Sequence, residues 1–408
     1  MVPKRWQATQ IGDVATFSSG GTPSKQTADY WGGGEPWISG KDLKSHYLNK
    51  SIDTLTEKGF ATAKKAPQGA SLILVRGMTL LKDFPVGYAS REVAFNQDIK
   101  ALVPKKNVDG LFLSFLLVAQ KNRIRQLVST AGHGTGRLDT SLIQGYPINL
   151  PPLPEQKKIA QILSTWDQAI TATEGLLENS QQRKKGLMQQ LLTGKKRLPG
   201  FEGEWEKTTL GAIGRISSAG VDKKIVEGEK SARLLNYLDV FRREFIFDHE
   251  LTHEVTAPER KIANCDVRKG DVFFTPSSET REEVGIPAVA VEDMPGVVYS
   301  YHVVRFRPSR PLDLSFAAYA FQTDEFRSQT YRLCDGSGQR YVLSQDDFRS
   351  IQITVPDLAE QKAIGLVLKA ASDEILALSD RINCLKQEKK ALMQQLLTGK
   401  RRVQVEAA

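Results

Sequence analysis

Two stretches of the chain decide its fold. Residues 151–197 read PPLPEQKKIAQILSTWDQAITATEGLLENSQQRKKGLMQQLLTGKKR, and residues 356–402 read PDLAEQKAIGLVLKAASDEILALSDRINCLKQEKKALMQQLLTGKRR. They align without a gap at an offset of 205 residues, and their ends match best: LPEQKKI against LAEQKAI, and LMQQLLTGKKR against LMQQLLTGKRR. Chance does not produce such a match, so the chain contains an internal duplication.

Each copy has the features of one long helix. A proline precedes each start, where it is tolerated, and Glu155 and Glu360 fall in the first turn, where an acid favours the helix dipole. Gly194 and Gly399 follow the last turn as expected C-caps, with Lys and Arg just beyond. Each helix should span about 38–40 residues, or roughly 57–60 Å at 1.5 Å per residue.

Apolar residues recur in both copies with a period of 3.5, which predicts a coiled coil. The seam of the first copy comprises Ile159, Leu163, Trp166, Ile170, Leu177, Leu187 and Leu191, with Thr173, Ser180 and Lys184 between them. The seam of the second comprises Ile364, Leu368, Ile375, Leu378, Ile382, Leu385, Leu392 and Leu396, with Ala371 and Lys389. The economical partner for each copy is the other, running antiparallel; pairing with a separate protein is the alternative.

A weaker repeat links the segments outside the helices. Residues 6–12 (WQATQIG) resemble residues 205–211 (WEKTTLG), and AFNQDIKALVP at 94–104 resembles VYSYHVVRFRP at 298–308. Apolar runs after Gly69 and Gly270 read as strands, and residues 111–128 and 314–333 read as amphipathic helices.

These patterns predict an α+β fold: two mixed α/β domains separated by two long antiparallel coiled-coil helices, with a pseudo-twofold internal repeat. The expected segments are a first domain at 1–150, a helix at 151–197, a second domain at 198–355, a helix at 356–402 and a tail at 403–408.

The bulk composition excludes several classes of protein. The chain has 408 residues, is 40% hydrophobic and carries no apolar run of the roughly 18 residues that a membrane span needs. The first ten residues, MVPKRWQATQ, lack the apolar region of a signal peptide. The three cysteines, Cys265, Cys334 and Cys384, form no CxxC pair, which suits the cytoplasm and argues against a disulfide framework or zinc ribbon.

The net charge of +9 is compatible with nucleic-acid binding but unevenly distributed. Residues 1–150 carry 19 Lys and Arg against 11 Asp and Glu, whereas residues 201–355 carry 20 against 25. If the second domain binds DNA, it needs a local basic face. We hypothesise that arginines build that face, namely Arg305, Arg307, Arg310, Arg327, Arg332 and Arg340.

The arrangement domain–helix–domain–helix, with PLPEQKKIAQIL and LMQQLLTGK at the helix ends, resembles the specificity (S) subunit of type I restriction-modification systems. The segments SSGGTPSK at 18–25 and WISGKDL at 37–43 are similar to the family's first target-recognition domain, whereas the second domain has Ser217-Ser-Ala-Gly-Val-Asp in place of GGTPS. The resemblance implies a cytoplasmic, non-catalytic subunit that reads an asymmetric bipartite site on double-stranded DNA, one domain per half-site.

The resemblance also implies the partners. Two modification methyltransferase subunits would dock on the spacer helices, and restriction/translocase subunits would join them. No cofactor is expected in this chain; S-adenosylmethionine and ATP belong to the partner subunits.

Candidate DNA-binding residues are those in loops that combine glycine with Ser, Thr, Lys or Arg, since glycine lets the backbone approach phosphate. In the first domain they are Ser18, Gly20, Gly21, Thr22, Ser24, Lys25, Lys41, Arg76, Arg91, His133, Thr135 and Arg137. In the second they are Arg242, Arg243, Thr275, Ser277, Ser278, Arg281, Tyr301, Ser337, Gln339, Arg340 and Tyr341. The loops AGHGTGR and DGSGQRY occupy matching places shortly before each long helix.

Catalytic motifs are weak or missing. His249-Glu250-Leu251-Thr252-His253 is a literal HExxH, but its strand-like flanks and Pro258 disfavour the helix that a zinc site needs, so neither catalytic nor metal-binding residues are predicted. The chain has no P-loop and no N/D-P-P-Y/F motif of amino-methyltransferases. The open alternatives are a specificity partner of another bipartite methyltransferase–nuclease system, a coiled-coil scaffold that binds no DNA, and a zinc hydrolase.

Overall fold

The computed structural model describes residues 4–131 and 134–404 and confirms the expected fold class. Contacts divide the chain into two compact units, Met1–Thr173 with Arg381–Ala408, and Glu174–Asp380. Each unit therefore combines one globular domain with parts of both long helices. The sequence-based segment boundaries stay a prediction, because this division falls inside the helices.

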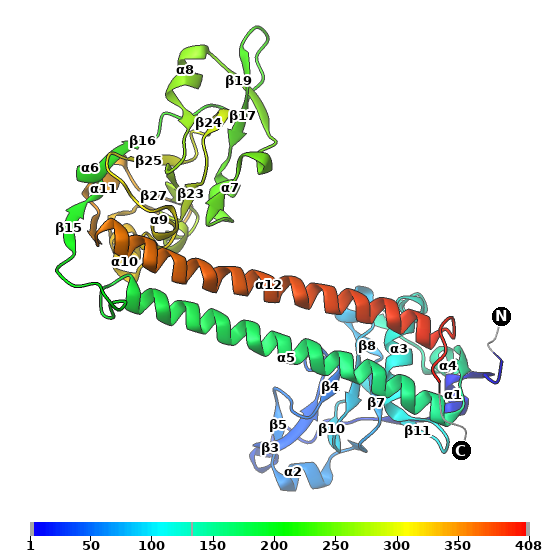
Figure 1. Cartoon of the computed structure of the whole chain (residues 1–408). Coiled ribbons are helices and arrows are strands. Elements are labelled where there is room, and N and C mark those ends of the chain that lie inside the picture. The colour runs from blue at the N-terminus through cyan, green and yellow to red at the C-terminus, as the bar shows by residue number, and fades with distance from the viewer. Residues whose placement is uncertain (1–3, 132–133, 405–408) are drawn as a thin grey trace. The chain divides into compact units, whose positions relative to one another are not determined.

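The long helices are α5 (Leu153–Leu191, 39 residues) and α12 (Leu358–Leu397, 40 residues). Within each unit they lie side by side and run antiparallel (Figure 1). In the first unit Lys389 Nζ of α12 lies 2.5 Å from Asp167 Oδ1 of α5. In the second unit Ser180 Oγ of α5 donates to Glu374 Oε1 of α12 at 3.1 Å. The two copies of the repeat are thus each other's partner.

Burial follows the heptad pattern in both helices. None of the seam residues named above is exposed, and Ile159, Leu163, Ile364 and Leu368 are at most 1% exposed. Ile159 and Leu163 join the core of the first domain, whereas Ile364 and Leu368 pack beside the second. The seam therefore also attaches each domain to the helix pair.

Two lysines interrupt the apolar seam at equivalent positions. Lys389 pairs with Asp167, and Lys184 Nζ lies 2.5 Å from Glu244 Oε1. Each ammonium group also lies over an aromatic ring of its own unit, at 5.1 and 4.9 Å from the ring centre. A charged residue within a coiled-coil seam restricts the register, because any slip would leave it buried without a partner.

The remaining elements occur in two matching sets. The first domain contains β1 (Gln7–Gln10), α1 (Ile11–Val14), β2 (Ala15–Ser19), β3 (Trp31–Ile38), β4 (Tyr47–Leu48), β5 (Thr54–Leu55), α2 (Glu57–Thr62), β6 (Lys65–Ala66), β7 (Ser71–Leu74), β8 (Arg76–Gly77), β9 (Val86–Ala89), β10 (Val93–Phe95), β11 (Ile99–Pro104), α3 (Gly110–Arg125), β12 (Ser129–Ala131), β13 (Thr135–Arg137), α4 (Thr140–Gln144) and β14 (Pro147–Leu150).

The second domain contains β15 (Glu206–Thr209), α6 (Leu210–Ile213), β16 (Gly214–Ser217), β17 (Lys230–Leu235), α7 (Tyr237–Phe241), β18 (Phe245–Ile246), β19 (Glu254–Ala257), α8 (Glu259–Asn264), β20 (Asp266–Val267), β21 (Val272–Phe274), β22 (Ser277–Ser278), β23 (Pro287–Ala290), β24 (Met294–Tyr299), β25 (Val304–Pro308), α9 (Leu314–Ala320), α10 (Asp324–Leu333), β26 (Asp335–Ser337), β27 (Arg340–Val342), α11 (Gln345–Ser350) and β28 (Gln352–Val355).

The sheets of the two domains have the same topology within the described residues. The five-stranded sheet has the order β2-β11-β7-β9-β4 in the first domain and β16-β25-β21-β23-β18 in the second. The four-stranded sheets, β5-β3-β10-β6 and β19-β17-β24-β20, and the two-stranded pairs, β1-β14 and β15-β28, also correspond. The weak repeat in the sequence therefore reflects one framework that was duplicated together with its helix.

The expected helix at 111–128 is confirmed as α3, but a single helix at 314–333 was wrong. The chain forms α9 and α10 with a break between them, because Thr323 caps a new helix by accepting a hydrogen bond from the Phe326 backbone N–H. Phe321 turns into the core at the break and is fully buried. Among residues 4–131 and 134–404, none of the helices has both the length and the apolarity that crossing a bilayer requires.

Candidate nucleic-acid interface

Each domain has a polar β-hairpin in a small three-stranded sheet, and the hairpins occupy the same topological position in the two domains. In the first domain the sheet order is β12-β13-β8, and in the second it is β22-β27-β26. These hairpins are formed by the loops AGHGTGR and DGSGQRY, which the sequence placed in matching positions. Each hairpin pairs with the short strand that follows a buried strand of the five-stranded sheet, so its outward side chains stand on a rigid support.

The hairpin of the first domain lines a basic pocket of about 330 Å³. Arg76 and Arg137 face each other across the β8–β13 ladder, and both are exposed. Lys100 and Gln97 line the same pocket. Thr22 donates to Gln97 Oε1 at 2.6 Å, which brings the SSGGTPSK loop to this site. The 18–25 loop, through its contact with Gln97, and β13, through Arg137, therefore lie at the same pocket although they are far apart in the sequence.

The two glycines of the SSGGTPSK loop fit against the framework. A Cβ on Gly20 would lie 2.2 Å from the Asn96 carbonyl oxygen, so only glycine allows this close approach. The Gly21 N–H donates to the Phe95 carbonyl oxygen at 2.8 Å. Their role in this structure is to hold the loop against the β10–β11 segment, while Ser24 and Lys25 of the same loop stay exposed.

The other candidates of the first domain differ in their surroundings. Ser24, Lys25 and Lys41 are exposed, and Ser18 and Thr135 are half-buried. Arg91 Nη2 lies 2.5 Å from Glu35 Oε2, so its charge is partly neutralised within the domain. His133 lies outside the described residues.

A larger pocket of about 510 Å³ occupies the equivalent edge of the second domain. It brings together four predicted residues, namely Ser277, Ser278, Gln339 and Arg340. Arg340 Nη2 donates to Ser277 Oγ at 2.8 Å, which holds the guanidinium group across the hairpin. Ser337 is exposed nearby on the hairpin.

The same pocket also contains aromatic side chains that are not among the predicted DNA-binding residues. Tyr237 and Phe241 stack with their ring centres 5.7 Å apart, and the ring of His302 lies tilted against that of the candidate Tyr301, with the centres 3.9 Å apart. Burial lowers the pKa of His302, helped by the positive charges of Lys223 and Arg340, so its ring is neutral near pH 7. The pattern LNYLDVF at 235–241 is typical of an ordinary apolar helix, and only its position beside the hairpin distinguishes Tyr237.

Arg281 and Tyr341 support the same hairpin. The Arg281 guanidinium carbon lies 4.9 Å from the Tyr341 ring centre and 5.3 Å from that of Tyr331. Arg281 Nη1 also donates to the Tyr331 carbonyl oxygen. This sandwich orients the hairpin and reduces the freedom of Arg281 to reach a ligand.

Two other candidates are corrected or weakened. Thr275 is fully buried; its hydroxyl donates to the Glu283 carbonyl oxygen and accepts from the Ile286 N–H, so it cannot contact DNA. Arg243 pairs with Asp239 and Glu250, whereas its neighbour Arg242 is exposed.

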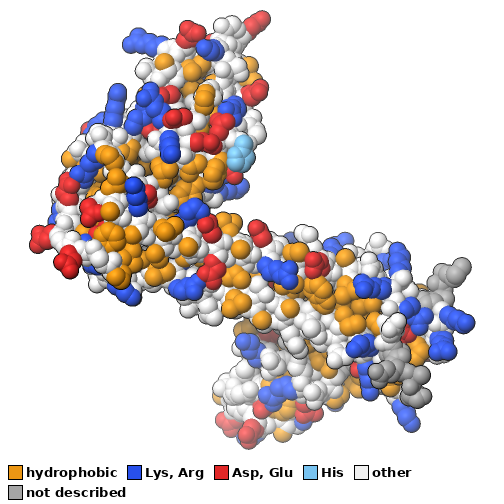
Figure 2. Space-filling view, viewed as in Figure 1, with side chains coloured by type: hydrophobic (Ala, Val, Ile, Leu, Met, Phe, Trp, Pro, Cys, Tyr) orange, Lys and Arg blue, Asp and Glu red, His pale blue; other side chains and the backbone are white. Residues whose placement is uncertain are grey.

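The hypothesis of a basic face in the second domain was wrong for most of its arginines. Arg305 is 5% exposed and pairs with Asp266, and Arg307 pairs with both Asp266 and Asp271. Arg310 pairs with Glu206, and Arg327 donates to the Val284 carbonyl oxygen at 2.7 Å. On the face that Figure 2 shows, acidic and basic side chains of this domain are intermixed. Of the proposed set, only Arg332 and Arg340 are exposed.

The HExxH sequence has no metal-site geometry. His249 and Glu250 lie in a three-residue 3-10 helix, Asp248–Glu250, and His253 follows in the loop before β19. His253 Nδ1 lies 3.0 Å from Asn236 Nδ2. Among residues 4–131 and 134–404, no group of three His, Cys, Asp or Glu side chains is arranged to hold a metal ion.

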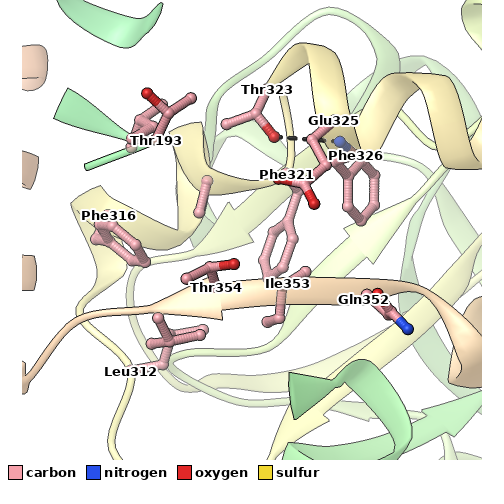
Figure 3. Close-up of a pocket in the computed structure, with 13 residues that line it drawn as sticks. Thr193, Leu312, Phe316, Phe321, Thr323, Glu325, Phe326, Gln352, Ile353 and Thr354 are labelled. Carbon is pink, nitrogen blue, oxygen red and sulfur yellow. Dashed lines mark hydrogen bonds between the residues drawn. The ribbon is translucent and has the colours of Figure 1, made fainter. Parts of the chain in front are cut away.

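A further cavity lies where α9, α10 and β28 meet (Figure 3). Phe316, Phe321, Phe326 and Ile353 line it, and the Thr323 cap of α10 closes one side. Its volume of about 40 Å³ holds no more than a few water molecules. It is a gap in the packing of the framework and not a ligand site.

The architecture thus defines a two-domain recognition protein whose polar hairpins stand on a repeated scaffold. The family model for the type I restriction modification DNA specificity domain matches residues 3–179 and 202–387. The chain belongs to this family and is a specificity subunit with two target-recognition domains and no catalytic role.

Curated relatives and solved structures agree with this assignment. The chain is 25% identical over 415 residues to the type I restriction enzyme MjaVIII specificity subunit of Methanocaldococcus jannaschii, covering 98% of this chain and 94% of the relative. It is 28% identical over 179 residues to the EcoR124I/EcoR124II specificity subunit of Escherichia coli, covering 43% and 44% of the two chains. The fold matches the S subunit from M. genitalium with a TM-score of 0.60 at 16% identity, over 96% of each chain.

Proposed function

We propose that the chain reads an asymmetric two-part site on double-stranded DNA, with one recognition domain per half-site. The observation that carries this proposal is the pair of hairpin-edge sheets, which stand at one topological position in both domains but carry different side chains. Arg76 and Arg137 offer donors suited to guanine or phosphate. Gln339, Arg340 and the stacked Tyr237 offer amide, guanidinium and aromatic contacts, so the second half-site should differ in sequence.

Members of this family assemble into type I complexes, and we propose two methyltransferase subunits as the direct partners of the spacer helices. The duplication gives two equivalent docking surfaces for identical subunits. On the helices of the second unit, Leu176, Leu366 and Leu376 support docking, since these apolar side chains are 55%, 70% and 61% exposed. Restriction/translocase subunits would complete the assembly in the cytoplasm, with S-adenosylmethionine and ATP bound by the partners.

The decisive experiment reconstitutes the full chain with the modification methyltransferase subunit of its own system and S-adenosylmethionine. The complex would methylate random-sequence DNA, and single-molecule sequencing would map the modified bases. We expect a two-part asymmetric motif with a fixed gap. A single unbroken motif, or no methylation by a stable complex that retains cofactor, would contradict the proposal.

We further propose that the helices set the gap between the half-sites. Four residues inserted after Thr173 and four after Asp380, where the compact units divide, would lengthen the helix pair by about 6 Å. A four-residue insertion in a heptad pattern is accommodated as a local change of supercoil. We expect a longer gap and two unchanged half-sites in the same sequencing assay; an altered half-site would contradict this role.

A further inference from the structure

Two clusters of identical composition join each recognition domain to the helix pair. The first clamp consists of Trp6, Glu155 and Arg402, all in the first compact unit. The second clamp consists of Trp205, Glu360 and Arg197, all in the second unit. In both, the carboxylate stands in the first turn of a long helix and the tryptophan opens a recognition domain.

The first clamp is a two-pronged ion pair beneath an indole ring. Arg402 Nε and Nη2 donate to the two carboxylate oxygens of Glu155 at 2.7 and 2.8 Å. The Trp6 indole N–H donates to Glu155 Oε2 at 3.2 Å, and the guanidinium carbon lies 5.8 Å from the Trp6 ring centre. Arg402 Nη1 also donates to the Lys4 carbonyl oxygen at 3.0 Å.

The second clamp repeats this geometry. Arg197 Nη2 donates to Glu360 Oε2 at 2.6 Å, and the Trp205 indole N–H donates to the same oxygen at 2.9 Å. The Arg197 guanidinium carbon lies 5.5 Å from the Trp205 ring centre. Arg197 Nη1 donates to the Gly203 carbonyl oxygen at 2.7 Å, as Arg402 does to Lys4.

The clamps are reciprocal between the two repeats. The acid at the start of one long helix binds the arginine that follows the end of the other, so each clamp needs residues from both copies. Gly194 and Gly399 end the helices at φ of +67° and +71°, a conformation that favours glycine. The turn that follows is closed by Lys196 N–H to Gln190 O and by Arg401 N–H to Gln395 O. The repeated TGKKR and TGKRR sequences therefore direct the last arginine back to the partner helix.

The glutamine beside each clamp glutamate makes the connection to the domain. Gln156 Oε1 accepts the backbone N–H of Asp109, and Gln361 Oε1 accepts that of Asp313. The two aspartates cap α3 and α9, which follow β11 and β25 at corresponding places in the two domains. The repeated Glu-Gln pair thus has two contacts: the glutamate holds the other helix and the glutamine holds the domain.

The clamp carboxylates are buried, so each needs strong hydrogen-bond donors. Glu155 is 2% exposed and Glu360 is fully buried, and a carboxylate out of water needs charge-assisted donors to stay ionised. A fork of two parallel N–H···O contacts also fixes direction, which a single contact does not. The clamp is therefore suited to setting an angle between the domain and the helices, beyond holding them together.

We propose that the two clamps are positioning joints, each of which holds one recognition domain in the orientation that reads its half-site. The proposal rests on the two-half-site function proposed above. Because each clamp lies within one compact unit, loosening one clamp should disturb only the half-site that this unit reads. For the first clamp this should hold although Arg402 lies far along the sequence from the domain that it positions.

The test compares Arg402→Gln with Arg197→Gln in the full chain, assembled with the methyltransferase subunit and assayed on random-sequence DNA. The matched controls are Arg401→Gln and Lys196→Gln, exposed residues one position before each clamp arginine. A displacement of about 1 Å can cost about 100-fold in an aligned reaction, so we expect sequence preference at one half-site to weaken by about tenfold or more. Arg402→Gln should affect one half-site, Arg197→Gln the other, and the controls neither.

The proposal would be overturned if either variant lost sequence preference at both half-sites, or if neither variant lost it at any half-site. If a single variant fails to fold because it leaves a buried carboxylate unpaired, the double variant Glu155→Gln/Arg402→Gln removes the charge as well. We expect that double variant to fold and to keep the one-sided defect. Wild-type reading of both half-sites by the double variant would mean that the pair has no positioning role.

Hydrogen exchange separates this inference from the proposed function. In the isolated chain, Arg402→Gln should speed amide exchange in β1 and the start of α5, while β15 and the start of α12 keep wild-type rates. Arg197→Gln should give the reverse pattern. A wild-type complex without a bipartite motif would refute the proposed function and leave this result intact, whereas equal changes in both units would refute the clamps as separate joints.

Discussion

The two recognition domains share one framework and differ where they face outward. Their sheets have the same strand orders, and their clamps have the same three side chains. At the hairpin edge, Arg76 stands opposite Arg137 in the first domain, whereas at the equivalent place in the second domain Ser277 stands opposite Val342. The clamp residues are the same in both units, whereas the residues proposed to face DNA are not. The comparison indicates one mechanical role and two ligands.

The loops after β2 and β16 show where the framework ends. Gly20 and Gly220 both pass so close to a neighbouring backbone that a Cβ would lie 2.2 Å from it. The next residues, Gly21 and Val221, donate their backbone N–H groups to the carbonyl oxygens of Phe95 in β10 and Tyr299 in β24, both at 2.8 Å. The change from GGTPS to SSAGVD thus keeps the one glycine that packing requires and replaces the outward residues.

We expect the largest effect on stability from substitutions in the helix seam, which both units share. Leu163 and Leu368 are equivalent in the repeat, and both are fully buried. We expect Leu163→Ala and Leu368→Ala each to lower the free energy of unfolding by about 2–5 kcal/mol, because each leaves a cavity. Leu366→Ala is the matched control, since that side chain is 70% exposed and should change stability by less than about 0.5 kcal/mol. Chemical denaturation followed by circular dichroism measures all three. If only one of the two substitutions lowered the free energy of unfolding, the two repeats would not be stabilised in the same way.

The difference between the hairpins predicts separable effects on DNA reading. Arg137→Ala and Arg340→Ala should each weaken binding to the cognate site by about 1–3 kcal/mol and relax specificity at a different half-site. Arg332→Ala is the control, because Arg332 is exposed on α10 of the same domain as Arg340 but lines none of the hairpin pocket. Binding titrations over a range of salt concentrations would measure the effect. An unchanged affinity and salt dependence for Arg340→Ala would remove the best candidate of the second domain.

The sequence predicted the framework well because the framework obeys local rules. Period 3.5 in the seam, glycine after the last helical turn and apolar runs after Gly69 and Gly270 each follow from backbone and packing constraints that act over a few residues. The break between α9 and α10 was missed because Thr323 and Phe321 are compatible with a continuing helix until the cap and the buried ring are seen together.

The candidate interface was only partly predictable, because exposure and pairing depend on the whole fold. Arg305 and Arg307 are ordinary basic residues in the sequence, and only the structure shows Asp266 and Asp271 beside them. Thr275 ends an apolar strand as a loop residue would, yet its hydroxyl is used inside the domain. The clamp arginines were interpreted as helix-end charges, because their carboxylate partners lie 247 and 163 positions away in the sequence.

The polar contacts beneath the helices differ between the units and predict different responses to acid. His46 precedes β4, and its ring stacks on Phe115 with the centres 4.9 Å apart. The equivalent residue before β18 is Glu244, which accepts the seam Lys184. Burial lowers the pKa of His46 to about 4; the charge of Asp167 opposes this shift and that of Lys389 adds to it.

We therefore expect the first unit to lose more stability than the second on mild acidification, because burial lowers the pKa of His46 further than that of His302 in the second unit. The unfolded chain takes up a proton at His46 near pH 6.5, whereas the folded chain does so near pH 4, so stability falls as the pH drops between these values. After allowance for the part of the ring that stays exposed, we expect the free energy of unfolding of the first unit to fall by on the order of 1 kcal/mol. Hydrogen exchange resolved by unit at pH 7 and pH 5 would measure it, with His46→Phe as the variant that removes the difference. Equal weakening of both units in the wild-type chain, or an undiminished effect in His46→Phe, would assign the acid response to groups other than His46.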